Sequence, residues 1–346
     1  MAFRSESRRP IAALAAWATL ALAGGATAAE NTPAAVTASD EACLLEALAS
    51  APDDATVGEL RARCARDQDQ PGGSLLMSRV RREQAVERIP SLLTPHRRNY
   101  FLPATYATDP NEAPFADESG ALPAGESLDH VEAKFQLSLK FSLAEGFLLP
   151  RDRLYFGFTT LSLWQAYNRN VSAPFRETNY EPELFWSAPL DWAPFGLDAG
   201  IVTLGMSHQS NGRGGTLSRS WNRLYADFEF EKDNLVVGLK PWWRIPEDDK
   251  DDPLDASGDD NPDIDDYLGY FEFTTVYRYQ DHEFGLLLRN NLRDDNRGAV
   301  QLDWTFPLWR GIRGYAQYFN GYGETLIDYD ARIERFGIGI LLTDLL

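Results

Sequence analysis

Much of the chain beyond residue 130 alternates between apolar and polar residues with a period of two. In residues 134–143 the two sets are Phe135, Leu137, Leu139, Phe141 and Leu143 against Lys134, Gln136, Ser138, Lys140 and Ser142. Residues 299–306 repeat the pattern, with Val300, Leu302, Trp304 and Phe306 set against Gln301, Asp303 and Thr305. Successive side chains of a strand point to opposite faces of its sheet. These segments therefore predict strands with one apolar and one polar face.

The same reading predicts about twelve strands from residue 99 onward. The other ten share the alternation or are rich in aromatic residues, and they lie at 99–106, 154–167, 181–186, 199–210, 222–230, 235–243, 267–279, 283–290, 314–322 and a last strand ending at 340. Short turns at 232–234 and 279–282 alternate with long connections, of which residues 248–266 form the longest. An even strand number with short turns on one side and long loops on the other is typical of a bacterial outer-membrane barrel.

Composition supports this fold class. The 346 residues include 12% aromatics, with 9 Trp and 14 Tyr, while 25% of residues are charged and the mean hydropathy is −0.37. No run of about 18 apolar residues occurs after the first 30, which excludes a transmembrane helix there. We expect an all-β protein, a twelve-stranded antiparallel transmembrane β-barrel with a polar interior. A soluble barrel or β-sandwich is the alternative that composition leaves open.

The formal net charge of −19 bears on possible partners. Nucleic-acid binding depends on basic surfaces, so this charge argues against it. Acidic loops are compatible with binding of a divalent cation.

The N-terminus has the features of an export signal. Arg4, Arg8 and Arg9 precede an apolar run at 11–24 and the small residues Ala26-Thr27-Ala28. This order predicts a secretory signal peptide over residues 1–28, with cleavage after Ala28. The protein is therefore expected in the bacterial outer membrane, with the barrel domain at 96–346.

Residues 29–95 differ in composition from the rest and predict a partly helical periplasmic extension. Cys43 and Cys64, the two cysteines of the chain, both lie in this extension. In an oxidising compartment an isolated pair most simply forms one disulfide, which here would join two short helices. Residues 74–88 are basic and are compatible with either an amphipathic helix or a solvated linker.

One stretch carries candidate chemistry. In residues 199–210 the even positions Val202, Leu204 and Met206 lead into His208 and Ser210, which therefore end the more apolar face as neighbours. In the returning strand Asn222 shares a face with Leu224, Ala226, Phe228 and Phe230. A hairpin would bring Asn222 back beside His208.

A nucleophile, an adjacent base and a group that orients the base form the general arrangement of a hydrolytic triad. In this hypothesis Ser210 attacks, His208 accepts its proton and Asn222 holds the imidazole. Gly212 could present a backbone N–H to an oxyanion, because it has no side chain to block the approach. The triad would lie on the apolar side of the barrel, where the expected substrate is a lipid.

These residues resemble those of the outer membrane phospholipase A family. Its members are calcium-dependent phospholipases that are built as twelve-stranded barrels and are active as dimers. The similar segments are SAPFRETNYEP at 172–182, the stretch at 208–223, DNPD at 260–263 with Tyr267 and Gly269-Tyr270, and GYGE at 321–324 followed by LIDY at 326–329. The resemblance extends from about residue 130 to the C-terminus and does not include the N-terminal extension. It implies the same roles for Ser210, His208, Asn222 and Gly212.

The resemblance also implies a calcium ion beside the triad at the dimer interface. Its ligands would be the carbonyls of Arg213 and Ser218 of one subunit and the hydroxyl of Ser172 of the other, while Asp260 matches a further acidic position. Oxygen ligands of this kind suit Ca²⁺ rather than zinc. Two positions depart from the family: Gly215 replaces an acidic residue, and Thr160 replaces an amide that supports dimer contacts.

The sequence thus predicts a calcium-dependent hydrolase that cleaves acyl esters of membrane phospholipids through an acyl-serine intermediate and is activated by homodimerisation. It would release fatty acid and lysophospholipid. Two other classes remain possible at this point. A porin-like channel would function without Ser210, and a structural or adhesive barrel would bind calcium without ester turnover.

Overall fold

The computed structural model describes residues 47–48, 56–60, 74–87, 93–115, 122, 125–149, 151–171, 175–190, 192, 194–252, 254–255, 257–309 and 312–344. The predicted signal peptide and both cysteines lie outside these residues. Within the described part, no helix has the length and apolarity needed to cross a membrane.

The described chain is mostly antiparallel strands. Their bounds are β1 Thr94–Pro95, β2 Asn99–Ala107, β3 Val131–Glu145, β4 Arg153–Trp164, β5 Glu177–Leu190, β6 Ala199–Ser210, β7 Ser220–Lys232, β8 Leu235–Arg244, β9 Phe271–Tyr279, β10 His282–Asn290, β11 Gly298–Trp309, β12 Ile312–Gly321 and β13 Ile333–Thr343. The helices are α3 Leu75–Glu87 and α4 Ile264–Leu268, and short 3₁₀ turns lie at Ala113–Phe115, Pro194–Gly196 and Gly215–Leu217.

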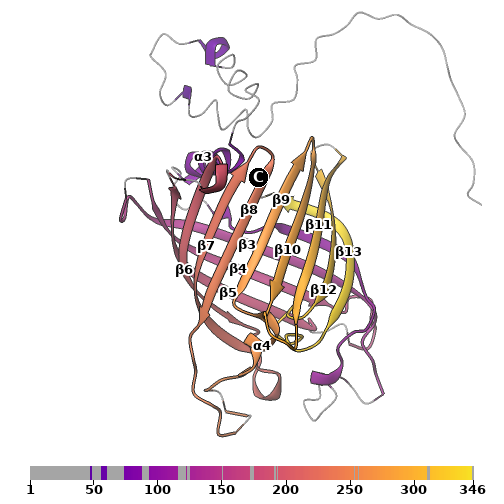
Figure 1. The fold of residues 1–346 in the computed structure, drawn as a ribbon. Helices are drawn as coiled ribbons and strands as arrows, with labels where there is room; N and C mark the ends of the chain where they lie inside the picture. Colours follow the sequence, from indigo (N-terminus) through magenta and orange to yellow (C-terminus); the bar gives the residue numbers. More distant parts are fainter. Residues whose placement is uncertain are drawn as a thin grey trace, which may run out of the picture. The chain divides into compact units, whose positions relative to one another are not determined.

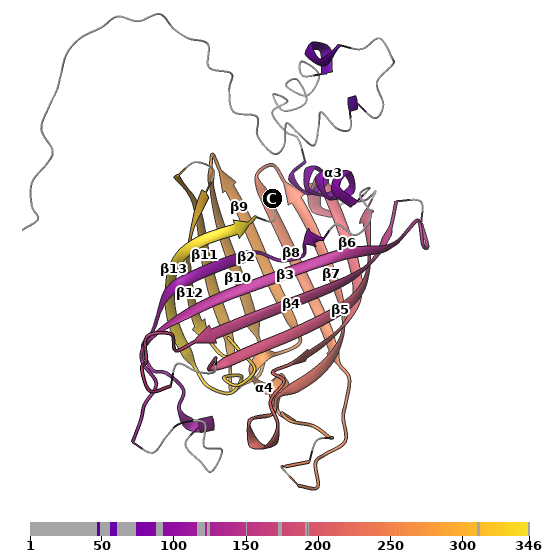
Figure 2. The same ribbon diagram turned by 180° about the vertical axis from the view of Figure 1, so that it is seen from behind.

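The strands β2 to β13 close into a twelve-stranded antiparallel barrel, as the sequence predicts (Figures 1 and 2). Each strand pairs with its neighbours in sequence, and β13 returns to pair with β2. The short strand β1 pairs with β3 beside the start of β2. Closure leaves no unpaired edge, which a spanning sheet requires because lipid cannot hydrogen-bond to its backbone.

The two ends of the barrel differ. At one end, two-residue turns join β7 to β8 and β9 to β10, and Asp233 and Gln280 there have positive φ values of 52° and 54°. At the other end lie the long connections, including 245–270 with α4 (Figure 1). Outer-membrane barrels have short periplasmic turns and long extracellular loops. We therefore call them the turn end and the loop end, with the loop end facing outward from the cell.

The helix α3 packs at the turn end against β6 and β7 (Figure 2). Leu76 is fully buried, and its backbone N–H donates to Glu231 Oε2 at 2.7 Å. Arg79 forms two hydrogen bonds with the carboxylate of Glu229. Residues 75–87 are thus a helix anchored to the barrel, which decides against the solvated linker that the sequence also allowed.

The barrel interior is polar, as the alternation predicts. Glu132 is fully buried between Arg176 at 2.7 Å and Arg335 at 2.9 Å. Lys134 and Glu324 form a further buried pair at 2.8 Å. The opposite face of the same strands carries exposed apolar side chains, including Leu137, Leu139, Phe141, Val300, Leu302 and Trp304. This is the outward apolar band of a membrane barrel.

One strand begins later than the sequence predicts. The expected strand at 267–279 starts at Phe271, because residues 264–268 form α4. Gly269 ends the helix with a φ of 69°, a conformation that favours glycine. Ile264 and Leu268 are buried in a cluster with Trp221 and Trp242, so the aromatic residues here pack inside the loop end instead of extending the strand.

Candidate active site

The β6–β7 hairpin brings the three predicted triad residues to the outward face of the barrel. His208 lies directly opposite Asn222 in the ladder, and Ser210 lies opposite Ser220. Ser207 is 4% exposed and Trp221 is fully buried, so the residues adjoining the candidates point inward. The period-two alternation therefore places His208, Ser210 and Asn222 outward, as the sequence predicts.

The imidazole of His208 is held by the amide of Asn222. His208 Nδ1 lies 2.9 Å from Asn222 Oδ1. An amide oxygen can only accept, so Nδ1 carries the proton and Nε2 is left with its lone pair. Asn222 Nδ2 donates in turn to Glu247 Oε1 at 2.9 Å. This second bond fixes which way the amide faces.

Ser210 stands two residues beyond His208 on the same face, a spacing of roughly 7 Å between Cα atoms. Its neighbour across the β5–β6 ladder is Tyr180. Leu204, Met206 and Leu224 extend the same outward surface and are 48%, 49% and 44% exposed. An ester carried by an apolar chain could therefore approach Ser210 from the lipid side.

The loop between β6 and β7 is fixed by Asn211. This buried side chain donates to the Leu217 carbonyl at 2.8 Å and accepts from the Arg219 and Arg213 backbone N–H groups at 3.0 and 3.2 Å. Gly212 has a φ of 64°, and a Cβ there would lie 3.2 Å from the Tyr180 ring. A side chain at Gly212 would be strained, so the glycine is required by the turn that follows Ser210.

The residues implied as calcium ligands lie partly in this loop. The carbonyl of Ser218 accepts a hydrogen bond from Arg219 Nη1 at 2.6 Å, and it retains a second lone pair. Arg213 anchors the loop through its guanidinium, which donates to the carbonyls of Phe175 and Arg176. Ser172 lies outside the described residues. Backbone carbonyls on a short loop are the oxygen donors that calcium prefers, so Arg213 and Ser218 fit the ion.

The position of Asp260 is different, because its carboxylate already has a cation. Asp260 Oδ1 lies 2.5 Å from the Lys250 ammonium, and the two side chains are 7% and 10% exposed. Asp260 Oδ2 accepts from the hydroxyls of Ser218 and Ser220 at 2.9 and 3.0 Å. Asp260 would join a calcium site only by exchanging Lys250 for the ion. No group of three or more His, Cys, Asp or Glu side chains suited to a metal occurs among the described residues.

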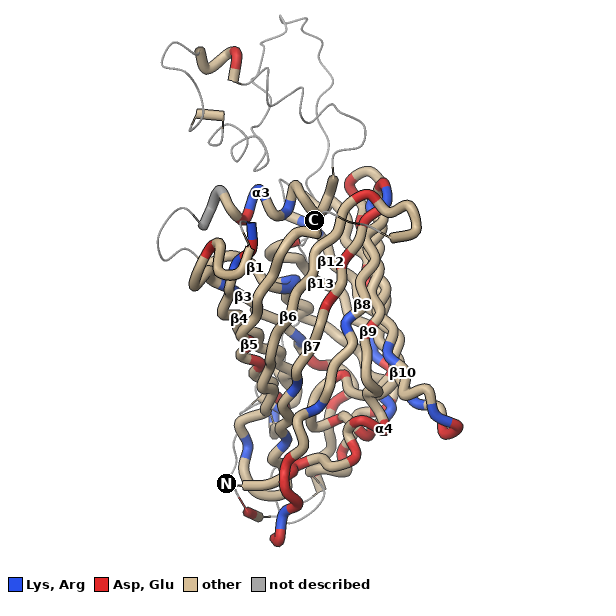
Figure 3. Tube along the Cα trace, turned by 60° about the vertical axis from the view of Figure 1, so that its left-hand side comes forward, with Lys and Arg blue, Asp and Glu red and all other residues tan. Residues whose placement is uncertain are grey.

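The loop end is acidic around this site, as Figure 3 shows near α4. Tyr329 donates to Asp263 Oδ1 at 2.7 Å, and the guanidinium of Arg219 lies 5.8 Å from the Tyr329 ring centroid. Burial raises the pKa of Tyr329, and the hydrogen bond to Asp263 adds to this shift. The phenol therefore stays protonated as a donor and ties residues 322–332 to the 245–270 connection.

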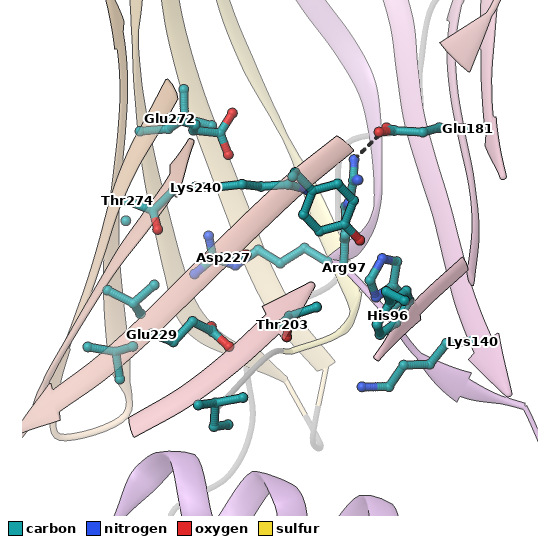
Figure 4. Close-up of a pocket in the computed structure, with 18 of the residues that line it drawn as sticks. His96, Arg97, Lys140, Glu181, Thr203, Asp227, Glu229, Lys240, Glu272 and Thr274 are labelled. Atoms are coloured by element: carbon teal, nitrogen blue, oxygen red, sulfur yellow. Dashed lines mark hydrogen bonds and ion pairs between the residues drawn. The ribbon is translucent and has the colours of Figure 1, made fainter. Parts of the chain in front are cut away.

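A separate cavity of about 420 Å³ lies inside the barrel between α3 and the loop end (Figure 4). Arg97 pairs with Glu181 and Glu183 at 2.8 and 2.7 Å, and His96 bonds to Glu183 at 2.8 Å. His96 thus belongs to the interior ion-pair network. This cavity faces away from His208, on the other side of the barrel wall, so it does not contribute to the triad.

Two residues near the site have no signal in the sequence pattern. Glu247 and Lys250 lie in the long acidic connection, where no sequence pattern distinguishes one charged residue from the next. Only the approach of residues 245–260 to the β6–β7 hairpin brings them to Asn222 and Asp260.

Comparisons with known proteins identify relatives of this chain. The Phospholipase A1 family profile matches residues 76–342. The Phospholipase A1 of Klebsiella pneumoniae is 38% identical over 256 residues, which cover 74% of this chain and 84% of that protein. The structure of outer membrane phospholipase A from Escherichia coli superimposes with a TM-score of 0.66 at 37% identity and covers 73% of this chain and 95% of that chain. The calcium-bound dimer of the Salmonella typhi outer membrane phospholipase gives a TM-score of 0.66 at 36% identity, covering 74% and 94%.

Proposed function

This chain belongs to the Phospholipase A1 family and is an outer-membrane phospholipase, and from this premise we propose that Ser210, His208 and Asn222 form its catalytic triad. The observation that carries the proposal is the 2.9 Å contact of His208 Nδ1 with Asn222 Oδ1, on the outward face and beside Ser210. It leaves Nε2 of His208 as the base.

The reaction follows from these positions. Ser210 Oγ attacks the carbonyl carbon of an acyl ester, and His208 Nε2 takes the hydroxyl proton. The tetrahedral intermediate collapses by breaking the bond to the glycerol oxygen, which receives the proton from His208 and leaves as lysophospholipid. A water molecule then attacks the acyl-serine while His208 accepts its proton. Return of that proton to Ser210 releases the fatty acid.

The developing oxyanion needs hydrogen-bond donors in place before the reaction. In the proposal the backbone N–H of Gly212 supplies one, since the glycine leaves room for the carbonyl oxygen to approach. The carbonyls of Arg213 and Ser218, with Ser172 of a second subunit, would hold calcium, which would supply positive charge to stabilise the oxyanion.

The substrate is proposed to be membrane phospholipid and the active form a homodimer. The outward apolar surface beside Ser210 supports a lipid substrate, because Leu204, Met206 and Leu224 are exposed on the outer face of the barrel. A calcium-bound dimer of the Salmonella typhi relative supports a two-subunit site. Tyr180 and Thr160 face each other in the β4–β5 ladder. The family resemblance puts Thr160 at a dimer-contact position, so we propose this wall as the dimer surface.

The interior argues against the channel that the sequence left open. The helix α3 packs at the turn end, and the cluster around Trp221, Trp242 and Ile264 fills the loop end. An open pore has a water-filled lumen, whereas the cluster at the loop end and buried ion pairs such as Lys134 with Glu324 fill part of this one.

Covalent labelling of the folded protein with a fluorophosphonate tests the triad. The reagent phosphonylates only an activated serine, so we expect peptide mass spectrometry to find the label on Ser210. His208→Ala should slow labelling strongly, and Ser210→Ala should abolish it. Labelling of another serine at the wild-type rate in Ser210→Ala would overturn the assignment.

A further inference from the structure

We propose that Glu247 is a positioning residue for this triad. Glu247 orients the Asn222 amide, and its negative charge stabilises the protonated His208 through that amide. The inference rests on the proposed function, since it assigns a role relative to the triad. It adds a carboxylate to a triad whose third member is neutral. The juxtaposition that carries it is His208 Nδ1 to Asn222 Oδ1 at 2.9 Å and Asn222 Nδ2 to Glu247 Oε1 at 2.9 Å.

The backbone explains how Glu247 reaches Asn222. The N–H of Ile245 donates to the carbonyl of Asn222 at 2.8 Å, which continues the β7–β8 register beyond the pair Arg223–Arg244. Pro246 keeps the residue before it extended. Glu247 then lies diagonal to Asn222 on the same outward face, a spacing that a long side chain can bridge.

The bond to Glu247 decides the orientation of the amide. Asn222 has one donor end and one acceptor end, and His208 needs the acceptor. A carboxylate can only accept, so it selects the orientation in which Nδ2 faces Glu247 and Oδ1 faces His208. Without Glu247 the amide could rotate and present Nδ2 to the imidazole.

The same bond also carries charge. Hydrogen bonds in a chain polarise one another, and a charged acceptor on Nδ2 makes Oδ1 a stronger acceptor. The imidazolium that forms when His208 takes the Ser210 proton is therefore stabilised by a carboxylate one amide away. In a triad whose third residue is aspartate, by contrast, the carboxylate hydrogen-bonds to the histidine directly.

This arrangement also accounts for asparagine at position 222. An aspartate there would bring two carboxylate oxygens to about 3 Å at Glu247, where like charges repel and one carboxylate tends to keep a proton. The charged residue and the neutral amide are thus a matched pair. Changing either one alone should harm the site, whereas changing both should restore part of it.

Steady-state kinetics on the calcium-loaded, detergent-folded protein test this coupling. We expect Glu247→Ala to lower kcat about tenfold with KM changed less than about twofold, and Glu247→Gln to lower it about threefold. Asn222→Asp should lose about a hundredfold, and adding Glu247→Gln to it should recover about tenfold. The control is Glu334→Ala, since Glu334 is an exposed carboxylate that accepts from Tyr318 at 2.8 Å on another strand. Equal kinetics for Glu247→Ala and Glu334→Ala, or no recovery in the double variant, would overturn the inference.

A readout that does not need turnover separates failure of this inference from failure of the proposed function. In a Ser210→Ala background, proton NMR of the four histidines should show a low-field Nδ1–H signal for His208. That signal should weaken or vanish in Glu247→Ala and persist in Glu334→Ala. Persistence in Glu247→Ala would refute the positioning role. Full activity in Ser210→Ala itself would instead refute the triad, and the NMR comparison would still decide whether Glu247 holds Asn222.

Discussion

Lys250 and Asp260 form a nearly buried ion pair, with the ammonium nitrogen 2.5 Å from Oδ1, beside the loop that follows Ser210. The other oxygen of Asp260 accepts from Ser218 and Ser220. The Lys250 ammonium therefore supplies the positive charge next to Asp260, the acidic position that the family resemblance associates with calcium. This ion pair stabilises the loop without a metal ion. At position 215 the family resemblance implies an acidic residue, and Gly215 leaves the same loop without that negative charge.

Replacing Lys250 with methionine should make this loop dependent on calcium. Asp260 would remain buried without a cation, which typically costs about 3 kcal/mol or more. We expect faster proteolysis within residues 248–262 in chelator and recovery in millimolar calcium, measured on monomers where a two-subunit site cannot form. The control is Lys232→Met, which removes an exposed pair with Asp198. Calcium-dependent protection of the wild-type loop under the same conditions would contradict this account.

Gly212→Ala should impair catalysis far more than Gly214→Ala in the same loop. Gly212 has a φ of 64° and faces the Tyr180 ring, whereas Gly214 has a φ of −117° and open space around its Cα. Alanine keeps the backbone N–H, but strain at this φ would move the N–H away from the oxyanion, and loss of one oxyanion donor lowers kcat by about 10²- to 10³-fold. Measurement of kcat for both variants checks this expectation, and equal effects at the two glycines would exclude a special role for Gly212.

Asn222→Ala should reduce kcat while leaving the barrel folded, because Asn222 faces outward and its loss opens no core cavity. Removing the acceptor of His208 Nδ1 frees the imidazole to rotate and should lower kcat about a hundredfold. Asn320→Ala is the matched control, since Asn320 bonds to Tyr318 on β12, remote from the hairpin. Fatty-acid release in parallel assays gives the comparison. Similar rates for the two variants would remove Asn222 from the mechanism.

Arg176→Met should destabilise the fold itself. Arg176 bonds to Glu132 and Asp328, and all three side chains are at most 3% exposed. Removing the arginine that both carboxylates share should lower the free energy of unfolding by about 3–5 kcal/mol. Urea unfolding in lipid vesicles measures this loss, with the exposed Arg332→Met as control. A change below about 1 kcal/mol would show that the two carboxylates are stabilised by other groups.

Parts of this molecule that follow a short period were predictable from the sequence. The alternation at 199–210 places His208 and Ser210 outward because a strand has a fixed period of two, and the hairpin then determines Asn222. The sequence predicts Tyr267 in a strand, which is wrong, since an aromatic residue before a strand fits either an extended segment or the helix α4. Burial of Ile264 in the loop end, which depends on distant strands, decided between them.

Contacts between segments far apart in the chain were not predictable. Arg79 and Glu229 are 150 residues apart, and their pairing anchors α3 to the barrel. Arg176 and Asp328 belong to two motifs that the family resemblance identified, but only folding brings them together. The partners of Glu247 and Lys250 were not predictable for the same reason. The sequence around a charged loop residue does not indicate which distant residue it will contact.

We propose above all that this barrel hydrolyses phospholipid esters with Ser210 and calcium. The most direct test is fatty-acid release from phospholipid in mixed micelles by the purified full chain, with calcium or excess chelator, beside Ser210→Ala. We expect turnover in the calcium-loaded wild type, and a loss of at least about a thousandfold in either chelator or Ser210→Ala. Turnover that survives the Ser210 substitution, or its absence from a folded, calcium-loaded dimer, would contradict it.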